Sequence, residues 1–258
     1  MPIVGSYSTD FYADRHDASL YSARVILDQV TDILPPLASA VDMGCGVGTW
    51  LSVLVDKGVE DVCGLDGPWV DTSLLRIAPE RYTTTDLEEP VRFDRRYDLA
   101  ISLEVAEHLS PASAPTFVAS LVAASDFDLF SAAIPYQGGS HHVNEQWPEY
   151  WAELFDVHGY DAVDCIRSSI WTDSAIPTWY RQNTLLYVQR ERLVDLALEN
   201  AGAPFPTLSV VNPDSFVNKL STVKVSWRSF RHALKRWFAI RIGTSNDTPP
   251  GDTPRDLI

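Results

Sequence analysis

The first 190 residues alternate between short apolar runs and longer segments whose apolar residues recur at helical spacing. Short runs bounded by turn residues suit buried strands, and apolar residues at every third or fourth position suit amphipathic helices. The predicted strands are residues 39–43, 61–66, 81–87, 97–103 and 127–135, and the predicted helices are residues 17–34, 48–58, 113–124 and 144–160. This alternation indicates a mostly parallel, doubly wound α/β sheet with right-handed crossovers.

Two further strands are predicted at residues 162–171 and 177–189. No segment long enough to form a helix separates them, whereas a parallel pair needs a long crossover connection. We therefore expect these two strands to run antiparallel to each other.

A glycine-rich turn follows the first predicted strand, in the sequence Val-Asp-Met-Gly-Cys-Gly-Val-Gly of residues 41–48. Glycines at this point let the backbone turn tightly and approach a ligand closely. A dinucleotide-binding loop would carry its third glycine at position 49, but that residue is Thr49 and the third glycine is Gly48. Acidic residues end the next two strands, Asp66 and Asp86, and a carboxylate can accept hydrogen bonds from both hydroxyls of a ribose.

These features together resemble the class I S-adenosylmethionine-dependent methyltransferases over roughly residues 37–190, on the strand pattern above. The shared features are the D-x-G-x-G-x-G motif from Asp42 to Gly48, the acidic residues at three consecutive strand ends and the antiparallel last strand. The resemblance implies a seven-stranded sheet and S-adenosyl-L-methionine as cofactor. It implies cofactor contacts from Asp42, Gly44, Gly46, Asp66, Gly67, Trp69, Asp86, Leu87, Leu103 and Glu104.

The motif Glu-Val-Ala-Glu-His follows the fourth predicted strand, which puts Glu104, Glu107 and His108 on one face of a helical turn. Two carboxylates and an imidazole can hold a divalent cation, and the absence of thiolates favours Mg²⁺ or Mn²⁺. Small-RNA 3′-end 2′-O-methyltransferases and ubiquinone-pathway O-methyltransferases carry a similar E-x-x-E-H motif. In the RNA group a later loop adds a histidine, a role that His142 of the loop 138–144 can fill, with His141 as candidate base.

A site without metal is the alternative, because similar sequences occur at this position in methyltransferases with no known metal. Glu104 would then contact the cofactor, and His108 or His141 would act as a base or orient the substrate. Either arrangement favours an oxygen nucleophile, because an aliphatic hydroxyl stays protonated at neutral pH and needs a base or a metal.

Aromatic residues are frequent beyond the fifth strand, and they suit either a helix and strand core or the apolar face of a sugar. The stretch from His142 to Trp151 and the later Trp-Tyr-Arg-Gln-Asn of residues 179–183 resemble uncharacterised bacterial methyltransferases encoded near polysaccharide genes. The predicted function is methyl transfer to a hydroxyl of a sugar, glycoside or polysaccharide precursor. The alternatives are a metal-independent methyltransferase of a small metabolite, acting on O or N, and a catalytically silent cofactor-binding regulatory module.

Charge and composition narrow the partners and the location. Residues 1–214 carry twelve basic and thirty-two acidic residues, and so large an acidic excess argues against nucleic acid, including RNA. The acceptor expected is a small molecule or an oligosaccharide. The N-terminus lacks the pattern of a signal peptide, and three cysteines without paired spacing do not form a disulfide framework, so we expect a cytoplasmic protein.

Four regions are predicted along the chain. They are an N-terminal helical cap (1–36), the S-adenosylmethionine-binding domain (37–190), a C-terminal helical extension (191–243) and a disordered tail (244–258). Within the extension, residues 223–243 form a basic amphipathic segment. Such a segment can contact an anionic membrane, a second copy of the chain or the acidic body of the protein itself.

Overall fold

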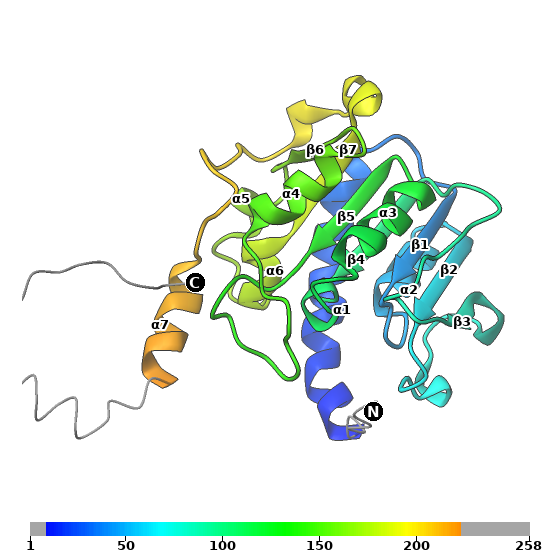
Figure 1. Ribbon diagram of the computed structural model, residues 1–258, viewed down its shortest axis with the longest axis horizontal. Coiled ribbons are helices and arrows are strands. Elements are labelled where there is room, and N and C mark those ends of the chain that lie inside the picture. Colours follow the sequence, from blue (N-terminus) through cyan, green and yellow to red (C-terminus); the bar gives the residue numbers. More distant parts are fainter. Residues whose placement is uncertain (1–8, 223–258) are drawn as a thin grey trace, which may run out of the picture. The chain divides into compact units, whose positions relative to one another are not determined.

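A seven-stranded sheet forms the centre of the protein in the structure, a computed structural model that describes residues 9–222 (Figure 1). Its strand order is β3-β2-β1-β4-β5-β7-β6, and β7 runs antiparallel to both of its neighbours while the other paired strands are parallel. The strands are β1 (Ser39–Met43), β2 (Asp61–Asp66), β3 (Tyr82–Thr84), β4 (Leu99–Leu103), β5 (Phe127–Ser131), β6 (Tyr160–Val163) and β7 (Leu185–Gln189). The predicted doubly wound sheet and its antiparallel last pair are confirmed.

Helices cover both faces of the sheet, and each face has its own hydrophobic cluster. The α-helices are α1 (Thr9–Ile33), α2 (Thr49–Asp56), α3 (Ala114–Ala124), α4 (Pro148–Asp156), α5 (Arg167–Ile170), α6 (Thr178–Asn183) and α7 (Pro213–Thr222). Residues of α1 and α2 pack with Ala40 of β1 in one cluster, and residues of α3 and α4 pack with Val41 in the other. Successive strand residues point to opposite faces, which explains why neighbours in β1 join different clusters.

Two predicted elements begin or end elsewhere because of particular side chains. The helix predicted over 144–160 starts only at Pro148, since proline suits the first turn of a helix and the residues before it are extended. The strand predicted over 127–135 ends at Ser131, and the chain then leaves the sheet for the loop that precedes α4.

The two late strands are shorter than the sequence pattern predicts. The predicted strand 162–171 ends at Val163, where a buried ion pair between Asp164 Oδ2 and Arg167 Nη2 (2.7 Å) draws the chain into α5. The predicted strand 177–189 begins with α6 after Pro177, and only Leu185–Gln189 pairs in the sheet. The aromatic and branched residues of these segments indicate strands. The buried Arg167 also donates to the carbonyls of Gln182 (3.1 Å) and Leu208 (2.7 Å), and these tertiary contacts outweigh the local preference.

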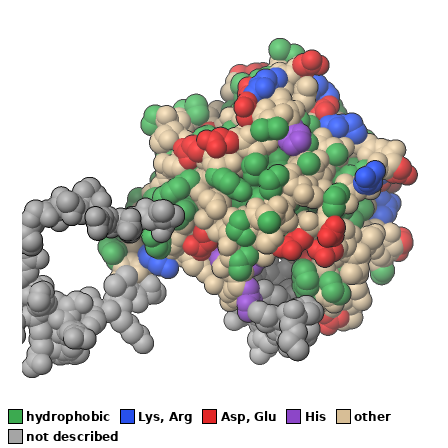
Figure 2. All heavy atoms as spheres, viewed as in Figure 1, with side chains coloured by type: hydrophobic (Ala, Val, Ile, Leu, Met, Phe, Trp, Pro, Cys, Tyr) green, Lys and Arg blue, Asp and Glu red, His purple; other side chains and the backbone are tan. Residues whose placement is uncertain are grey.

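The chain divides into two compact units after Phe216, and α1 belongs to the same unit as the sheet. The predicted basic amphipathic segment 223–243 and the tail 244–258 lie outside the described residues. On the face drawn in Figure 2, several Lys and Arg side chains lie next to acidic ones. The described residues form ion pairs such as Arg192–Asp126 (2.7 Å) and Arg190–Asp161 (2.8 Å). Within residues 9–222, none of the helices combines the length and hydropathy needed to cross a membrane.

Candidate active site

The glycine-rich turn between β1 and α2 depends on backbone conformations that favour glycine. Gly44, Gly46 and Gly48 have φ angles of 94°, 54° and 81°, all in the left-handed region. The Gly44 N–H donates to the carbonyl of Leu65 (2.7 Å), which ties the turn to the end of β2. A Cβ on Gly44 would overlap the side chain of Val105 beyond β4, so the turn runs close against the next strand end.

Two buried carboxylates lie beside this turn. Asp66 accepts the N–H groups of Gly46 and Gly67, both at 2.7 Å, so each of its oxygens already has a backbone donor. Asp42 is almost fully buried, and its Oδ2 has no hydrogen-bond partner among the described residues. Burial raises the pKa of both carboxyls, and the charge of Asp66 raises the pKa of Asp42 further. The unpartnered oxygen of Asp42 fits a cationic or hydroxyl donor of a ligand.

The other predicted cofactor residues follow β2 and β3 at the same edge of the sheet. The Trp69 side chain hydrogen-bonds Asp66 and lies over Gly67, where a Cβ would overlap the indole ring. Trp69 is 62% exposed, so its ring is free for a flat ligand. Asp86 is exposed and accepts the N–H of Glu88 (3.0 Å) in a turn, while Leu87 next to it is buried in the core.

Glu104 lies beyond β4 in a strained conformation and is held by amide side chains. Its φ angle of 57° is uncommon for a residue other than glycine. Gln137 Nε2 donates to its Oε2 (2.9 Å), and Asn183 Nδ2 donates to its Oε1 (3.0 Å). Burial raises the pKa of Glu104, while hydrogen bonds from Asn183, Ser131 and Gln137 oppose the rise. These contacts explain two segments that the sequence singled out, the loop after β5 and the Gln-Asn pair of residues 182–183.

The loop between β5 and α4 returns to the segment after β4. The N–H groups of Val143 and Asn144 both donate to the carbonyl of Glu107, at 2.8 and 3.0 Å. His142, just before them, is thereby placed against His108, with ring centroids 4.8 Å apart and ring planes at 87°. His141 is exposed and has a φ angle of 63°, so its side chain does not lie in this pair.

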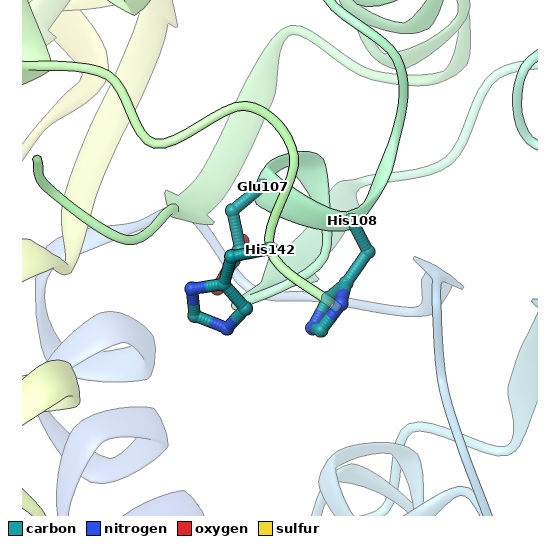
Figure 3. Close-up of side chains that lie close together, drawn as sticks. All are labelled: Glu107, His108 and His142. Carbon is teal, nitrogen blue, oxygen red and sulfur yellow. The ribbon is translucent and has the colours of Figure 1, made fainter. Parts of the chain in front are cut away.

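Glu107, His108 and His142 form a cluster in which the possible metal-ligating atoms all lie within 4.8 Å of one another (Figure 3). Glu107 is 1% exposed, and its Oε2 has no hydrogen-bond partner among the described residues. Burial and the neighbouring Glu104 raise the pKa of Glu107 well above its ordinary value. Burial and His142 lower the pKa of His108 to about 4, so this imidazole is neutral at physiological pH. The cluster can hold a divalent cation through one carboxylate and two imidazoles.

The structure brings three of the four predicted metal ligands within 4.8 Å of one another, and Glu104 is a neighbour of this group but not a member of it. The prediction assumed one helical turn from Glu104 to His108. The left-handed backbone at Glu104 interrupts that turn, and the short 3₁₀ helix begins only at Ala106. Both carboxylate oxygens of Glu104 accept amide hydrogens instead.

Glu145 is a further residue of the site, and sequence reasoning did not identify it. Its Oε1 lies 3.0 Å from Nδ1 of His142 and accepts the N–H of Gly138 (2.7 Å), and its Oε2 accepts the N–H of Tyr136 (2.8 Å). The only signal in the sequence was that Glu145 stands three residues after His142. Residues in a loop have no fixed periodicity, so this spacing does not predict a contact between the two side chains.

The aromatic residues of this region divide into core and rim. Trp151 of α4 is 2% exposed and belongs to the hydrophobic core, and Tyr180 is buried against Trp50. Tyr136 is 82% exposed and Trp147 is 41% exposed, and both lie in or next to the loop that carries His142. Of the two uses that the sequence leaves open for its aromatic residues, the first pair serves the core, and the exposed pair is accessible to a ligand.

Residues 15–125 match the family model for a methyltransferase domain. DesVI of Streptomyces venezuelae has a similar fold, with a TM-score of 0.51 and 14% identity over 69% of this chain and 94% of that one. An O-methyltransferase family protein from Burkholderia thailandensis gives a TM-score of 0.48, with 11% identity over 70% of this chain and 57% of that one. A SAM-dependent methyltransferase from Archaeoglobus fulgidus gives a TM-score of 0.46, with 16% identity over 60% of this chain and 76% of that one.

No curated protein matches the sequence significantly. The family match and the likeness to DesVI agree with the strand order, so the chain carries a methyltransferase domain with the class I fold.

Proposed function

We propose that this protein is an S-adenosylmethionine-dependent O-methyltransferase that methylates a hydroxyl of a sugar, glycoside or polysaccharide precursor with the help of a divalent cation. The methyltransferase domain supports the reaction class. The observation that carries the finer proposal is the buried, unpartnered Oε2 of Glu107 beside two imidazoles, at the edge of the sheet that also carries the glycine-rich turn.

The residues around the glycine-rich turn fit the cofactor. The free Oδ2 of Asp42 suits the ammonium group of its methionine part, because a buried carboxylate oxygen without a donor is costly until a ligand supplies one. Asp66 has further lone pairs for ribose hydroxyls, and the exposed Trp69 ring offers a face for adenine. The cofactor supplies a methyl group already activated for displacement, so the main contribution of the protein is to align the acceptor oxygen.

Glu107, His108 and His142 would hold the cation, and their donor set fits it. The buried Oε2 of Glu107 has no hydrogen-bond partner within residues 9–222, and the neutral His108 has a lone pair to offer. A bound divalent cation lowers the pKa of a hydroxyl that it ligates, which is the help that an aliphatic alcohol needs at neutral pH. Glu104 then has a different role, because Gln137 and Asn183 hold it at the border of the site and outside the ligand set.

The rim of the site supports a carbohydrate acceptor. Tyr136 and Trp147 expose aromatic faces near the cluster, and such faces suit the C–H face of a sugar. Residues 1–214 carry thirty-two acidic but only twelve basic residues, so a neutral, hydroxyl-rich acceptor fits the protein better than a phosphate backbone.

The test is methyl transfer from labelled S-adenosylmethionine to a panel of sugars and glycosides, with EDTA or with added Mg²⁺ or Mn²⁺. We expect activity that disappears with EDTA and returns with metal. A parallel binding measurement with the cofactor alone separates a wrong acceptor panel from a wrong cofactor. Bound cofactor with no transfer to any acceptor would favour a silent binding module.

A metal-independent methyltransferase is the second candidate, and one observation favours it. His108 is the exposed member of the cluster, so its imidazole can reach an acceptor hydroxyl and accept its proton. Activity that is indifferent to EDTA but lost in His108→Ala would support this candidate and contradict the metal proposal.

A further inference from the structure

The loop that carries His142 is closed around a single carboxylate. Glu145 accepts backbone N–H groups from Tyr136 and Gly138, at 2.8 and 2.7 Å, which fixes the start of the loop against its end. Tyr136 and Gly138 have φ angles of 68° and 73°, conformations that need such tertiary support, above all for the tyrosine. The same carboxylate reaches Nδ1 of His142 at 3.0 Å.

That contact determines which ring nitrogen of His142 is available. A carboxylate can only accept a hydrogen bond, so the 3.0 Å contact requires a proton on Nδ1. In the neutral imidazole the lone pair is then on Nε2, and Nε2 becomes the nitrogen that can bind a cation or accept a proton.

Gly139 lets the loop backbone pack closely against this end of the His142 ring. A Cβ at position 139 would overlap Nε2 of His142 as well as the two neighbouring ring carbons. Gly139 is not among the described residues with positive φ, unlike Gly138, so its backbone would accept alanine. The requirement for glycine here is therefore space beside the imidazole and not backbone conformation.

We propose that Glu145 and Gly139 are positioning residues of the active site. Glu145 holds the proton of His142 on Nδ1, and Gly139 leaves the space that the imidazole needs to keep this orientation. This inference rests on the proposed function, in which His142 is a cation ligand, and it adds the residues that orient that ligand. Supporting carboxylates of this kind contribute about 10–100-fold to metal affinity in metalloproteins, so their removal is measurable.

The first test measures Mn²⁺ binding to the full chain by electron paramagnetic resonance, with Glu145→Gln, Gly139→Ala and Glu149→Gln. Glu149 is a matched control, because its carboxylate also accepts a backbone N–H, that of Ser209 (2.9 Å), but no hydrogen bond joins it to a histidine in the described part of the chain. We expect Glu145→Gln to weaken Mn²⁺ binding by about 10–100-fold and Gly139→Ala by at least as much. Glu149→Gln should bind Mn²⁺ as the wild type does, and all three variants should bind S-adenosylmethionine normally.

The second test reads the histidine directly and needs no metal. Nitrogen-15 NMR of the imidazoles should show His142 with its proton on Nδ1 in the wild type and in Glu149→Gln, and a shift toward the other tautomer in Glu145→Gln. If the wild type binds no Mn²⁺, the metal part of the proposed function is wrong. The NMR measurement of the His142 tautomer still tests the role of Glu145 in that case. A His142 tautomer that Glu145→Gln leaves unchanged would overturn the inference itself.

Discussion

The two halves of the active edge are built differently. On the cofactor side, Asp42, Asp66 and the glycines lie within 25 positions of one another and bond mainly to nearby backbone, as in the contact of Gly46 N with Asp66. On the acceptor side, the contacts join distant segments, such as Asn183 with Glu104 across 79 positions. A site of the first kind can be recognised from motif spacing, whereas a site of the second kind exists only once the sheet is formed.

The two halves also differ in how they satisfy buried carboxylates. Both oxygens of Asp66 have backbone donors, but Oε2 of Glu107 has none in the described structure. A buried oxygen without a partner does not by itself identify a binding site. Asp128 in β5 is also buried, and neither of its carboxylate oxygens has a partner among the described residues. The difference is that imidazoles face Glu107. The possible ligand atoms gathered around Glu107, and not burial alone, indicate a binding site.

The largest effect is expected from Glu107→Gln. The change keeps the size of the side chain and removes its charge, so Mn²⁺ affinity should fall by roughly 1,000-fold, about 4 kcal/mol, while cofactor affinity stays nearly constant. Calorimetric titration with each ligand measures both quantities. Asp128→Asn is the control, since it removes a second buried carboxylate outside the cluster, and equal losses of Mn²⁺ affinity in both variants would erase the distinction drawn above.

A comparison of two glycines tests the cofactor side. Gly44→Ala combines a left-handed φ of 94° with overlap between the new methyl and Val105, so we expect a loss of roughly 2–3 kcal/mol in the free energy of unfolding. Gly46→Ala shares the positive φ but has open space around the new methyl, and should lose only about 1 kcal/mol. Urea denaturation of both variants gives the two values. A larger loss in Gly46→Ala would contradict the packing against Val105.

A smaller effect is expected from Asp66→Ala. Loss of the carboxylate removes the acceptor assigned to the ribose hydroxyls and frees two backbone N–H groups, so cofactor affinity should fall at least about tenfold, or about 1.4 kcal/mol. Mn²⁺ affinity should not change. Asp71→Ala is the matched control, because Asp71 is exposed and bonds only to Ser73 in its own turn. Cofactor affinity unchanged in Asp66→Ala would remove this residue from the cofactor site.

The smallest effect is a dependence of stability on pH. Burial raises the pKa of Asp128 well above its ordinary value, although Arg96 opposes the rise and Asp126 adds to it. The folded state therefore binds this proton more tightly than the unfolded state, and Asp128 costs stability as the pH rises above the unfolded pKa. Asp128→Asn should match the wild type near pH 4 and become progressively more stable than the wild type as the pH rises to 8. Thermal unfolding from pH 4 to pH 8 measures the stability difference between variant and wild type. A difference that stays the same at every pH would show that the charge of Asp128 does not cause it.

Parts of the fold that depend on local pattern were predictable. The strands 39–43 and 61–66 have the predicted bounds because each is a short apolar run that a turn closes. The late segments were not predictable in the same way: the buried pair of Asp164 and Arg167 and the helix after Pro177 replace most of two predicted strands. In the site, the histidine pairing followed from motif resemblance, but the exclusion of Glu104 did not, because a left-handed backbone angle leaves no trace in residue spacing.

The sequence by itself determined the doubly wound sheet, the glycine-rich turn and the acidic residues at three strand ends, because these depend on periodicity and on residues close together in the chain. Only the tertiary structure decided that Glu104 is not part of the cluster of Glu107, His108 and His142, and that Glu145 contacts the imidazole of His142. It also decided which buried carboxylates lack a partner. The physical reason is that these contacts join loops whose conformations are fixed by hydrogen bonds between distant strand ends, such as the donation from Val143 to the carbonyl of Glu107.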